Sequence, residues 1–463
     1  MKVLLINPPP REVKRFENFI IPPIGLSYVA AALKKAGVDV EILDANALQL
    51  TWDELDAEIG HYGPIDVIGI TGMSPTIDRT YKTAKIAKRF CNHLILGGPH
   101  GTICTDKTFE ECPEIDIIVL HEGEITMPEL IKELDGKGDI SKVKGIAFKM
   151  HDMVIKTPRR DLIQNLDEIE QPARYLLPMD KYRYPIAKHK KIAIIISSRG
   201  CPYGCLFCNK AMFGQQWRAR SASNVVDEIE SVHKTHGVKT FIFYDDLFVT
   251  DRKRAMDICQ GIIDRGLKID WKCEARVNLV DKELLTKMKE SGCSCISFGV
   301  ESANQKSLDF LNKGITVAQT REAFKLTKEA DIERMAYLII GIPGESREDA
   351  MRTINFAEEI DADYVQIAIL TPMEKTPLFD LAKEKGWIQA REAKGLFDED
   401  KKRYILVTGD IPDEDLEQLM QDAHKRFLLR PKYIFKTIKR IRSFNQLKNI
   451  FITGLQYLAY MKK

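Results

Sequence analysis

Long apolar runs are missing from this chain of 463 residues. No stretch approaches the roughly 20 consecutive apolar residues that a membrane-spanning helix needs. The opening MKVLLINPPP begins with a short apolar run, but its prolines follow too early for a secretion signal. We therefore expect a cytoplasmic protein, in which cysteine thiols stay reduced.

An excess of one charge is missing too. Lys and Arg number 69 against 67 Asp and Glu, a formal net charge of +2, which gives no reason to expect nucleic acid as a partner. Ten cysteines are too few for a disulfide scaffold of this size. No period of roughly 20 to 50 residues recurs, which argues against a solenoid of repeats. The chain is nevertheless too long for one ordinary domain.

Residues 1–140 alternate apolar runs with helical patterns. The runs expected to form strands span 2–8, 38–45, 65–72, 93–99 and 115–124. Helical patterns lie between them, for example at 22–37 and 76–90. Strands that alternate with helices predict an open, doubly wound parallel sheet, a Rossmann-like α/β fold.

Ligands of such sheets bind outside the carboxyl ends of the strands. The residues expected at that edge are Asn7, Pro8, Thr71, Gly72, Ser74, Gly97, Gly98, His100, Glu122, Gly123 and Glu124. Glycines let a large ligand approach the backbone, and hydroxyl and amide groups offer hydrogen bonds. Any one of these loops is readily explained as a tight turn, but four of them at one edge predict a ligand site.

A second alternation follows a break. Residues 141–185 hold a hairpin pattern at 145–157 and then a proline-containing linker. Over 186–385, the strands expected span 191–198, 239–246, 269–276, 295–302, 335–343 and 364–370. Six strands in βα order predict a partial or full barrel, with chemistry at the carboxyl ends of its strands.

Three cysteines gather directly after the first barrel strand, in SSRGCPYGCLFCNK (197–210). Cys201, Cys205 and Cys208 have the spacing CX3CX2C. Structural zinc sites usually need four ligands, whereas three thiolates leave one iron of a [4Fe–4S] cluster open to another ligand. A structural zinc site and a closed cluster with a distant fourth cysteine are the weaker alternatives.

This loop resembles the CX3CXΦC motif of radical S-adenosylmethionine (SAM) enzymes, with Phe207 as the aromatic Φ. The resemblance covers roughly residues 190–380 and implies that the three cysteines ligate a [4Fe–4S] cluster whose open iron binds SAM. In that family an electron from the cluster cleaves SAM to a 5′-deoxyadenosyl radical.

Four further segments resemble that family's SAM-binding motifs, in the family's order: FIFYDDLF (241–248), WKCEARVN (271–278), ISFGVES (296–302) and IIGIPGES (339–346). The first segment implies that Asp245 and Asp246 contact the SAM amino group, and the second that Arg276 contacts its carboxylate. The third implies that Glu301 and Ser302 contact the ribose region, and the fourth that Gly341 and Ile342 lie near adenine. The two aspartates replace a commoner Gly-Gly-Glu, and a helix cap is their alternative role.

The first domain resembles the cobalamin-binding domain that precedes the barrel in one large radical SAM subclass. The usual DXHXXG motif, whose histidine coordinates cobalt, is missing, so the lower axial ligand stays open. His100 and His121 are candidates to touch the corrin, with ordinary hydrogen bonding as the alternative. Cys91, Cys104 and Cys112 are expected on or beside helices, so we predict no second cluster there.

The C-terminal part, 386–463, is expected to be helical and basic. Residues 425–463 contain eleven Lys or Arg and no acid, with apolar residues at helical spacing. Such helices could pack on the barrel, touch an anionic membrane surface or bind a protein. Just before this part, 370–380 resembles the family's TPXPGTXL segment, but Glu374 and Lys375 replace Pro-Gly, which leaves the local turn in doubt.

Both cofactors together imply a cobalamin-dependent radical SAM C-methyltransferase. An unactivated sp³ carbon has no lone pair, so hydrogen abstraction must precede methyl transfer from methylcobalamin. Tyr244 and Tyr337 are candidate inner-barrel donors that steer the substrate, with core packing as their alternative role. The other hypotheses are an oxidative cyclase or rearrangement enzyme and, from another class, a cobalamin-binding redox sensor.

The expected partners are a substrate and a source of electrons. A protein side chain, a peptide, a lipid and a tetrapyrrole all remain possible as substrate. The electron donor would be external, such as flavodoxin or ferredoxin, and we expect a monomer without nucleic acid.

Overall fold

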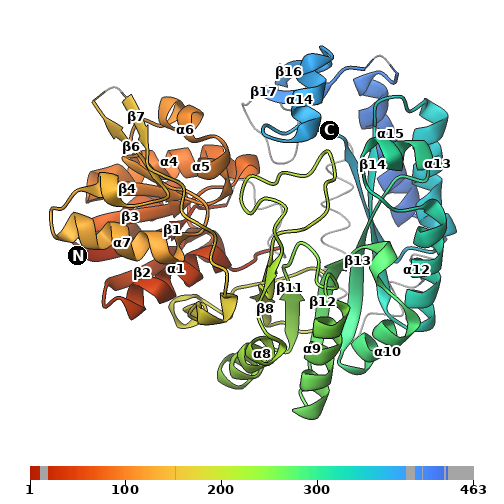
Figure 1. Ribbon diagram of the computed structural model, residues 1–463, viewed down its shortest axis with the longest axis horizontal. Coiled ribbons are helices and arrows are strands. Elements are labelled where there is room, and N and C mark those ends of the chain that lie inside the picture. Colours follow the sequence, from red (N-terminus) through yellow and green to blue (C-terminus); the bar gives the residue numbers. More distant parts are fainter. Residues whose placement is uncertain (11–18, 152, 393–401, 409, 432–433, 436–463) are drawn as a thin grey trace.

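The computed structural model describes residues 1–10, 19–151, 153–392, 402–408, 410–431 and 434–435. Two α/β halves lie side by side, the first built from the N-terminal part and the second from the residues after the linker (Figure 1). The mixed α/β architecture expected from the sequence is confirmed.

The N-terminal sheet has seven strands in the order β2-β1-β3-β4-β5-β6-β7. Their bounds are β1 (Lys2–Asn7), β2 (Asp39–Asp44), β3 (Ile65–Thr71), β4 (Cys91–Gly97), β5 (Ile117–Val119), β6 (Ile146–Met150) and β7 (Met153–Lys156). Strands β1 to β5 are parallel, whereas β6 and β7 are antiparallel. The hairpin thus continues the first sheet, although the sequence placed it with the linker; the boundary at residue 140 stays a prediction.

Helices cover both faces of this sheet, as expected of a doubly wound fold. Val3 and Leu5 of β1 pack on one face with helices α1 (Ile24–Lys35) and α7 (Gly123–Asp135). Leu4 and Ile6 pack on the other face, in the apolar cluster with α3 (Trp52–His61), α4 (Ile77–Ala87) and α6 (Thr105–Glu111). Short helices α2 (Ala45–Leu48) and α5 (Pro99–Ile103) follow β2 and β4. Because successive strand residues face opposite ways, a strand that is buried on both faces needs a continuous apolar run.

The second half is a partial barrel of six parallel strands in the order β8-β11-β12-β13-β14-β15. Their bounds are β8 (Ile192–Ile195), β11 (Thr240–Phe243), β12 (Asp270–Ala275), β13 (Cys293–Glu301), β14 (Glu333–Ile340) and β15 (Tyr364–Ile369). The intervening helices are α8 (Ala222–His236), α9 (Arg252–Asp264), α10 (Lys282–Glu290), α11 (Gln305–Phe310), α12 (Val317–Glu329) and α13 (Arg347–Glu359). All six strands match runs predicted from the sequence.

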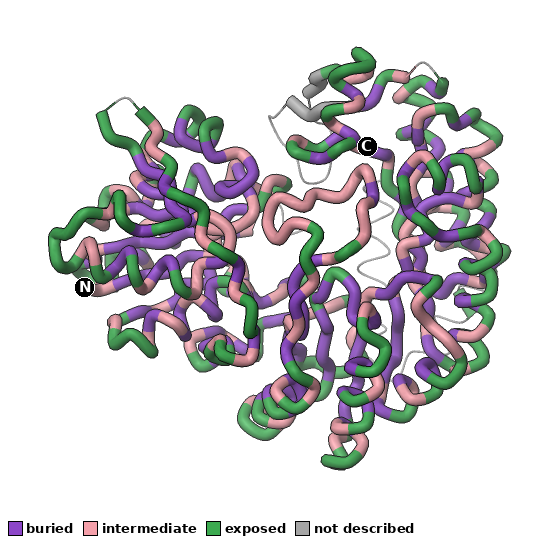
Figure 2. Tube along the Cα trace, in the orientation of Figure 1, coloured by how far each residue is buried: buried purple, intermediate pink, exposed green. Residues whose placement is uncertain are grey.

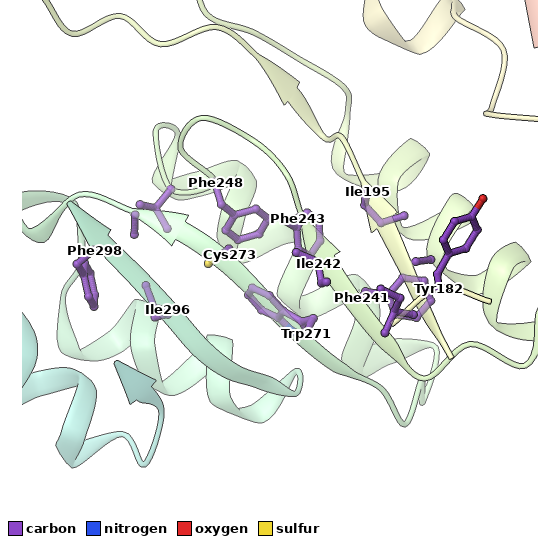
Figure 3. Packing of buried hydrophobic residues seen from close by; sticks show 14 of the residues in the cluster. Tyr182, Ile195, Phe241, Ile242, Phe243, Phe248, Trp271, Cys273, Ile296 and Phe298 are labelled. Carbon is purple, nitrogen blue, oxygen red and sulfur yellow. The ribbon is translucent and has the colours of Figure 1, made fainter. Parts of the chain in front are cut away.

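The two faces of the barrel sheet differ in burial. Along β14, Ala336, Leu338 and Ile340 are buried, while the residues between them are partly exposed (Figure 2). On the buried side, Trp271 packs against Phe243 and Phe248 with ring centroids 5.3 and 5.2 Å apart (Figure 3). The opposite, inner face is therefore the one available to ligands.

Several barrel helices begin at a residue whose side chain accepts a backbone N–H, which satisfies donors that the first turn leaves free. These caps are Ser221, Asp251, Asp281, Thr316 and Ser346. Because all six strands are paired in parallel, their carboxyl ends lie together at one mouth.

The C-terminal part contains α14 (Pro377–Glu384), the hairpin β16 (Ile388–Glu392) and β17 (Lys402–Leu406), and α15 (Asp413–Leu428). Leu416 and Leu419 of α15 belong to the barrel's apolar core. Most of the basic segment predicted for 425–463 lies outside the described residues. Within them, no helix is long and apolar enough to cross a membrane.

Candidate functional site

The cysteine loop is closed at its base by two short strands. Strand β9 (Ser198–Arg199) pairs antiparallel with β10 (Arg218–Ala219), so residues 200–217 form a loop that projects between the two halves (Figure 1). Gly200 has φ +83°, and a side chain there would collide with the carbonyl of Gln216. Only glycine suits this entry into the loop.

The three cysteines are neighbours within the loop. The backbone N–H of Cys208 donates to the Cys205 carbonyl at 3.2 Å. Burial raises the pKa of the Cys208 thiol, and Lys210 opposes the rise. Asp246, Cys205 and Cys201 add to it, which places these groups around Cys208.

The donor set fits an iron–sulfur cluster in its chemistry. All three thiols are free of disulfides, and three neighbouring thiols are what an open-iron cluster needs. Within the described ranges, no three Cys, His, Asp or Glu side chains converge closely enough to hold a metal ion as they stand. The assignment of the three cysteines as cluster ligands therefore rests on their place in one loop and on their spacing.

Arg276 lies directly against the cysteine loop. Its guanidinium stacks 3.7 Å from the ring centroid of Tyr203, and its Nη1 is 3.9 Å from the Cys205 sulfur. Its Nη2 donates to the Lys313 carbonyl. A cation beside the thiols suits the carboxylate-binding role predicted for Arg276.

The two aspartates after β11 differ in role. Asp245 is buried and accepts bonds from the backbone N–H and hydroxyl groups of Ser197 and Ser198, at 2.5 to 3.1 Å. It thereby anchors the start of the cysteine loop. Asp246 is exposed beside Cys208 and accepts a bond from the Gly200 backbone N–H, with Lys210 as a nearby cation. It is the aspartate that the ammonium group of a ligand could reach.

The predicted ribose and adenine segments are held by buried polar contacts. Glu301, at φ +61°, forms a buried ion pair with Lys313 at 2.5 Å. Ser302 is fully buried and donates to Glu345, which also accepts the backbone N–H of Ile342 at 3.2 Å. Gly341 adopts φ +76° at the same turn. Phe207 lies 5.9 Å from the Lys313 ammonium, which ties this region to the cysteine loop.

Glu274 is a polar residue of the inner barrel that the sequence argument missed. It accepts a bond from the Tyr337 hydroxyl at 2.9 Å. Burial raises its pKa to about 7, and Glu301 adds to the rise, while Tyr337 and Lys313 oppose it. Lys272, Glu274 and Arg276 alternate in the predicted strand, which is the signal that could have placed Glu274 on the inner face.

The two tyrosines singled out from the sequence both lie near Glu274. Tyr244 follows β11 and is 54% exposed. Burial and then the charge of Glu274 raise the pKa of both Tyr244 and Tyr337. The structure thus brings two phenols and a carboxyl group with a near-neutral pKa to one side of the barrel.

Glycines shape the carboxyl edge of the N-terminal sheet. Gly72 donates to the Gly97 carbonyl at 2.9 Å and accepts from the His100 backbone N–H at 3.1 Å. Gly98 adopts φ +96°, and a Cβ there would lie 2.8 Å from the Gly72 oxygen. At Gly97, by contrast, a Cβ would meet nothing within 4 Å. The edge is therefore tight at Gly98 and open at Gly97, which suits close approach of a large ligand.

His100 is held by hydrogen bonds through both ring nitrogens. Nδ1 lies 3.0 Å from the Ser74 hydroxyl and Nε2 lies 3.2 Å from the Tyr81 hydroxyl, with the ring buried. These contacts favour the hydrogen-bonding alternative over a cobalt ligand. His121 adopts φ +61°, and its Nδ1 lies 3.0 Å from the Met212 carbonyl in the cysteine loop.

The first strand's loop is also tied down. Asn7 donates to Asp44 at 2.7 Å, and the other Asp44 oxygen accepts the Tyr182 hydroxyl at 2.7 Å. Pro8 is buried, and the Thr71 carbonyl accepts the Thr80 hydroxyl at 3.2 Å. These groups build the edge, whereas the space beside Gly97 is where a ligand would lie.

Comparison with known proteins agrees with both halves. A radical SAM superfamily model matches residues 195–357, and a B12 binding domain model matches residues 18–131. The uncharacterized methyltransferase PH0819 of Pyrococcus horikoshii is 36% identical over 442 residues, which are 95% of each chain. The chain belongs to the cobalamin-dependent radical SAM methyltransferase family.

Other similar proteins have names that state different activities. An anaerobic magnesium-protoporphyrin IX monomethyl ester cyclase of Rubrivivax gelatinosus is 33% identical, over 89% of this chain and 75% of that protein. The solved methyltransferase TsrM of Kitasatospora setae, with cobalamin and a [4Fe–4S] cluster bound, shares the fold with a TM-score of 0.76. It is 19% identical, over 93% of this chain and 90% of that one.

The cofactors of this radical SAM methyltransferase are a [4Fe–4S] cluster, SAM and cobalamin. The three free thiols, the cation at Arg276 and the open space beside Gly97 fit these groups. A cobalt ligand from the protein stays unassigned, because both ring nitrogens of His100 have partners and His121 is held through Nδ1 by the Met212 carbonyl.

Glu122, Gly123 and Glu124 lie at the junction of the two halves. The carboxylates of Glu122 and Glu124 pair with Arg199 at 2.6 and 2.5 Å, and Gly123 packs near Val29 at the start of α7. The sequence predicted cofactor contacts for these three residues, and the structure adds an interdomain role.

The segment at 370–380 also bridges the halves. Lys375 adopts φ +61°, so the left-handed turn survives although lysine replaces the family's glycine. Its ammonium donates to the Thr102 carbonyl at 3.2 Å, and Cys104 donates to Glu374 at 3.4 Å. Asn209 of the cysteine loop donates to the Glu374 carbonyl at 3.0 Å. Glu374 and Lys375, which stand in place of the family's Pro-Gly, therefore both contact the cobalamin-binding half.

Proposed function

We propose that the enzyme methylates an unactivated sp³ carbon of its substrate. The observation that carries the proposal is the position of the cysteine loop between the glycine edge of the first half and the polar inner face of the barrel. When bound, the cluster, SAM and cobalamin supply a radical initiator and a methyl donor.

The overall reaction balances with two SAM molecules and two electrons. The first SAM takes one electron and the substrate hydrogen and leaves as methionine and 5′-deoxyadenosine. The second supplies the methyl group that replaces this hydrogen and leaves as S-adenosylhomocysteine. The second electron would be needed to return bound cobalamin to the form that accepts a methyl group.

The chain's own residues bind and orient. Cys201, Cys205 and Cys208 would ligate the cluster, with Arg276 and Asp246 holding the carboxylate and ammonium groups of SAM. Glu274 accepts a hydrogen bond from Tyr337 and so fixes the orientation of the phenol. Its carboxyl group, whose pKa is about 7, would face a substrate on the inner side of the barrel. Tyr244, half exposed at the end of β11, would border the substrate.

We also propose an external electron donor of the flavodoxin or ferredoxin type and a monomeric enzyme. A macromolecular or membrane-associated substrate is favoured by the basic residues of 425–463, which would attract anionic surfaces. Peptides, lipids and tetrapyrroles are the substrate types to be tested.

Oxidative cyclisation is the second candidate reaction. It is favoured by the 33% identity to an enzyme named as a magnesium-protoporphyrin ester cyclase. The two reactions differ in product mass, because methylation adds one CH₂ whereas cyclisation adds none.

A mass survey of a strain that lacks the gene tests the proposal. Small molecules and peptide digests from the deletion strain and from the complemented strain are compared. A species lighter by one CH₂ in the deletion strain, restored on complementation, is the expected result. Species that differ instead by oxygen or by loss of hydrogen would show that the enzyme catalyses oxidative cyclisation.

A further inference from the structure

The approach to the cysteine loop carries a buried cation that faces the other half of the molecule. Arg199 lies two residues before Cys201, at the end of β9, and is 8% exposed. Its Nη1 donates to Glu122 at 2.6 Å and its Nη2 donates to Glu124 at 2.5 Å. One guanidinium thus joins two carboxylates at the start of α7 in the cobalamin-binding half.

The far side of the same loop makes the matching contact. Arg218, in β10, donates from Nη1 to both oxygens of Glu122 at 3.0 Å. Glu122 further accepts the backbone N–H of Ile163 at 2.8 Å. Because β9 pairs with β10, both ends of the cysteine loop are tied to one carboxylate of the other half.

Arg199, Arg218, Glu122 and Glu124 form a neutral and buried group, which we call the clamp. Side-chain exposures of 5 to 10% exclude most water. In such surroundings one missing partner leaves a buried charge unbalanced, so the clamp holds its geometry tightly.

Independent contacts reinforce the clamp farther along the loop. His121 lies directly before Glu122 in the chain, and its Nδ1 lies 3.0 Å from the Met212 carbonyl. The His121 backbone N–H is held by the Thr102 hydroxyl at 2.9 Å. The loop that carries the cysteines is therefore fixed to the glycine edge from three directions.

We propose that Arg199, Glu122, Glu124 and Arg218 are positioning residues that set the distance and orientation of the cobalamin edge relative to the cluster loop. The proposal rests on the proposed function for the identity of the two ligands. For the methyl-donating SAM to reach the carrier, the SAM site at the cysteine loop and the cobalamin edge must be held at a fixed distance, and a misplacement of about 1 Å between reacting atoms can cost about 100-fold in rate.

The test compares the reconstituted full chain with its Arg218→Lys and Arg199→Lys variants. Each variant keeps the positive charge but replaces the planar guanidinium fork with a single ammonium group, which cannot reproduce the fork's contacts to the carboxylates. Asp363→Asn is the control, because Asp363 pairs with Arg334 in an equally buried site at the opposite end of the barrel strands.

Two rates are measured without any substrate. Reductive cleavage of SAM is followed as 5′-deoxyadenosine, and methyl transfer is followed as the absorbance change when the SAM methyl group bonds to cob(I)alamin. Titanium(III) citrate keeps cobalt reduced, and the second reaction releases S-adenosylhomocysteine. Iron content and bound cobalamin are determined on the same samples.

We expect both clamp variants to keep their iron, their cobalamin and their cleavage rate within about twofold, while methyl transfer falls about 10- to 100-fold. Asp363→Asn should change both rates equally or neither. Loss of both rates in parallel, or methyl transfer equal to wild type, would overturn the proposal.

Hydrogen exchange of the cofactor-free chain supplies a readout that does not depend on activity. The clamp predicts faster exchange of residues 200–217 and 122–126 in both clamp variants than in wild type or Asp363→Asn. Unchanged exchange in these segments would contradict the clamp. If wild type itself transfers no methyl group, the proposed function fails, and the exchange result still decides whether the clamp exists.

Discussion

The N-terminal sheet and the barrel sheet meet at the carboxyl ends of their parallel strands, yet the two edges are built differently. At the N-terminal edge the polar side chains are occupied: Asn7 binds Asp44, and His100 is held through both ring nitrogens. At the barrel edge, Asp246 and Tyr244 are exposed. The N-terminal edge therefore presents its backbone to a ligand, whereas the barrel edge presents polar and charged side chains.

This difference follows from what each edge must recognise. A corrin is large, so glycines that admit it to the backbone matter more than individual side chains. SAM is small and zwitterionic, and its recognition needs a cation and a carboxylate at defined positions. The clamp residues bind each other across the junction.

The largest effect is expected at the barrel edge. Cys208→Ala should abolish SAM cleavage, by at least about 1,000-fold, because a cluster cannot be retained on two thiolates. Iron analysis and electron paramagnetic resonance of the reduced protein measure the cluster directly. Cys91→Ala is the control, since Cys91 lies far along the chain in β4, and it should keep its iron. A Cys208 variant that retains a SAM-cleaving cluster would remove this residue from the ligand set.

A second test concerns the charge at the barrel edge, through the pKa of Glu274. Its folded pKa of about 7 lies above the ordinary 4.5, so the native state holds a proton that the unfolded state has lost. Native stability should therefore fall as pH rises from about 4.5 to about 7, by up to about 3 kcal/mol at 1.4 kcal/mol per pKa unit. Above pH 7 it levels off.

Glu274→Gln should remove that fall. Urea unfolding of the cofactor-free chain at pH 5 and pH 8 measures it, with the exposed residue Glu283→Gln as control. Equal pH dependence in wild type and Glu274→Gln would show that the carboxyl group is not buried beside Tyr337 as described.

The glycine edge makes a paired prediction. Gly98→Ala forces a side chain into φ +96° and against the Gly72 oxygen, which should destabilise the chain by about 1–3 kcal/mol. Gly97→Ala should leave the cofactor-free stability within about 0.5 kcal/mol, since its Cβ meets no protein atom. It should instead weaken cobalamin binding. Thermal unfolding and cobalamin titration separate the two effects; identical behaviour of both variants would contradict the distinction.

The smallest effect is expected at Lys375. Lys375→Gly relieves a left-handed conformation and loses the bond to the Thr102 carbonyl, so the two effects should nearly cancel, within about 1 kcal/mol. Calorimetry of the full chain measures the sum. A loss of several kcal/mol would mean that Lys375 joins the halves more strongly than one exposed contact allows.

The sequence predicted the local features well. Continuous apolar runs identified the strands, and the spacing of Cys201, Cys205 and Cys208 predicted a cluster loop, because both signals lie within a few residues. The hairpin at 145–157 was predicted too, but not the sheet that it joins, since pairing with β5 is a tertiary contact.

Contacts between the halves could not be predicted from one sequence. Glu122 and Arg199 are 77 positions apart, and nothing local in either segment indicates the other. The same holds for Tyr337 and Glu274, which are 63 positions apart on strands that are not adjacent in the sheet. Glutamates at a strand end were therefore interpreted as ligand contacts, and their partners became visible only in the folded chain.

The measurement that tests the central claim most directly uses SAM with a trideuterated methyl group. Reconstituted enzyme, reductant and an extract of the deletion strain are incubated and analysed by mass spectrometry. The account predicts one product that carries an intact trideuteromethyl group, with 5′-deoxyadenosine and S-adenosylhomocysteine formed in equal amounts. Formation of 5′-deoxyadenosine without S-adenosylhomocysteine and without a deuterated product would contradict it.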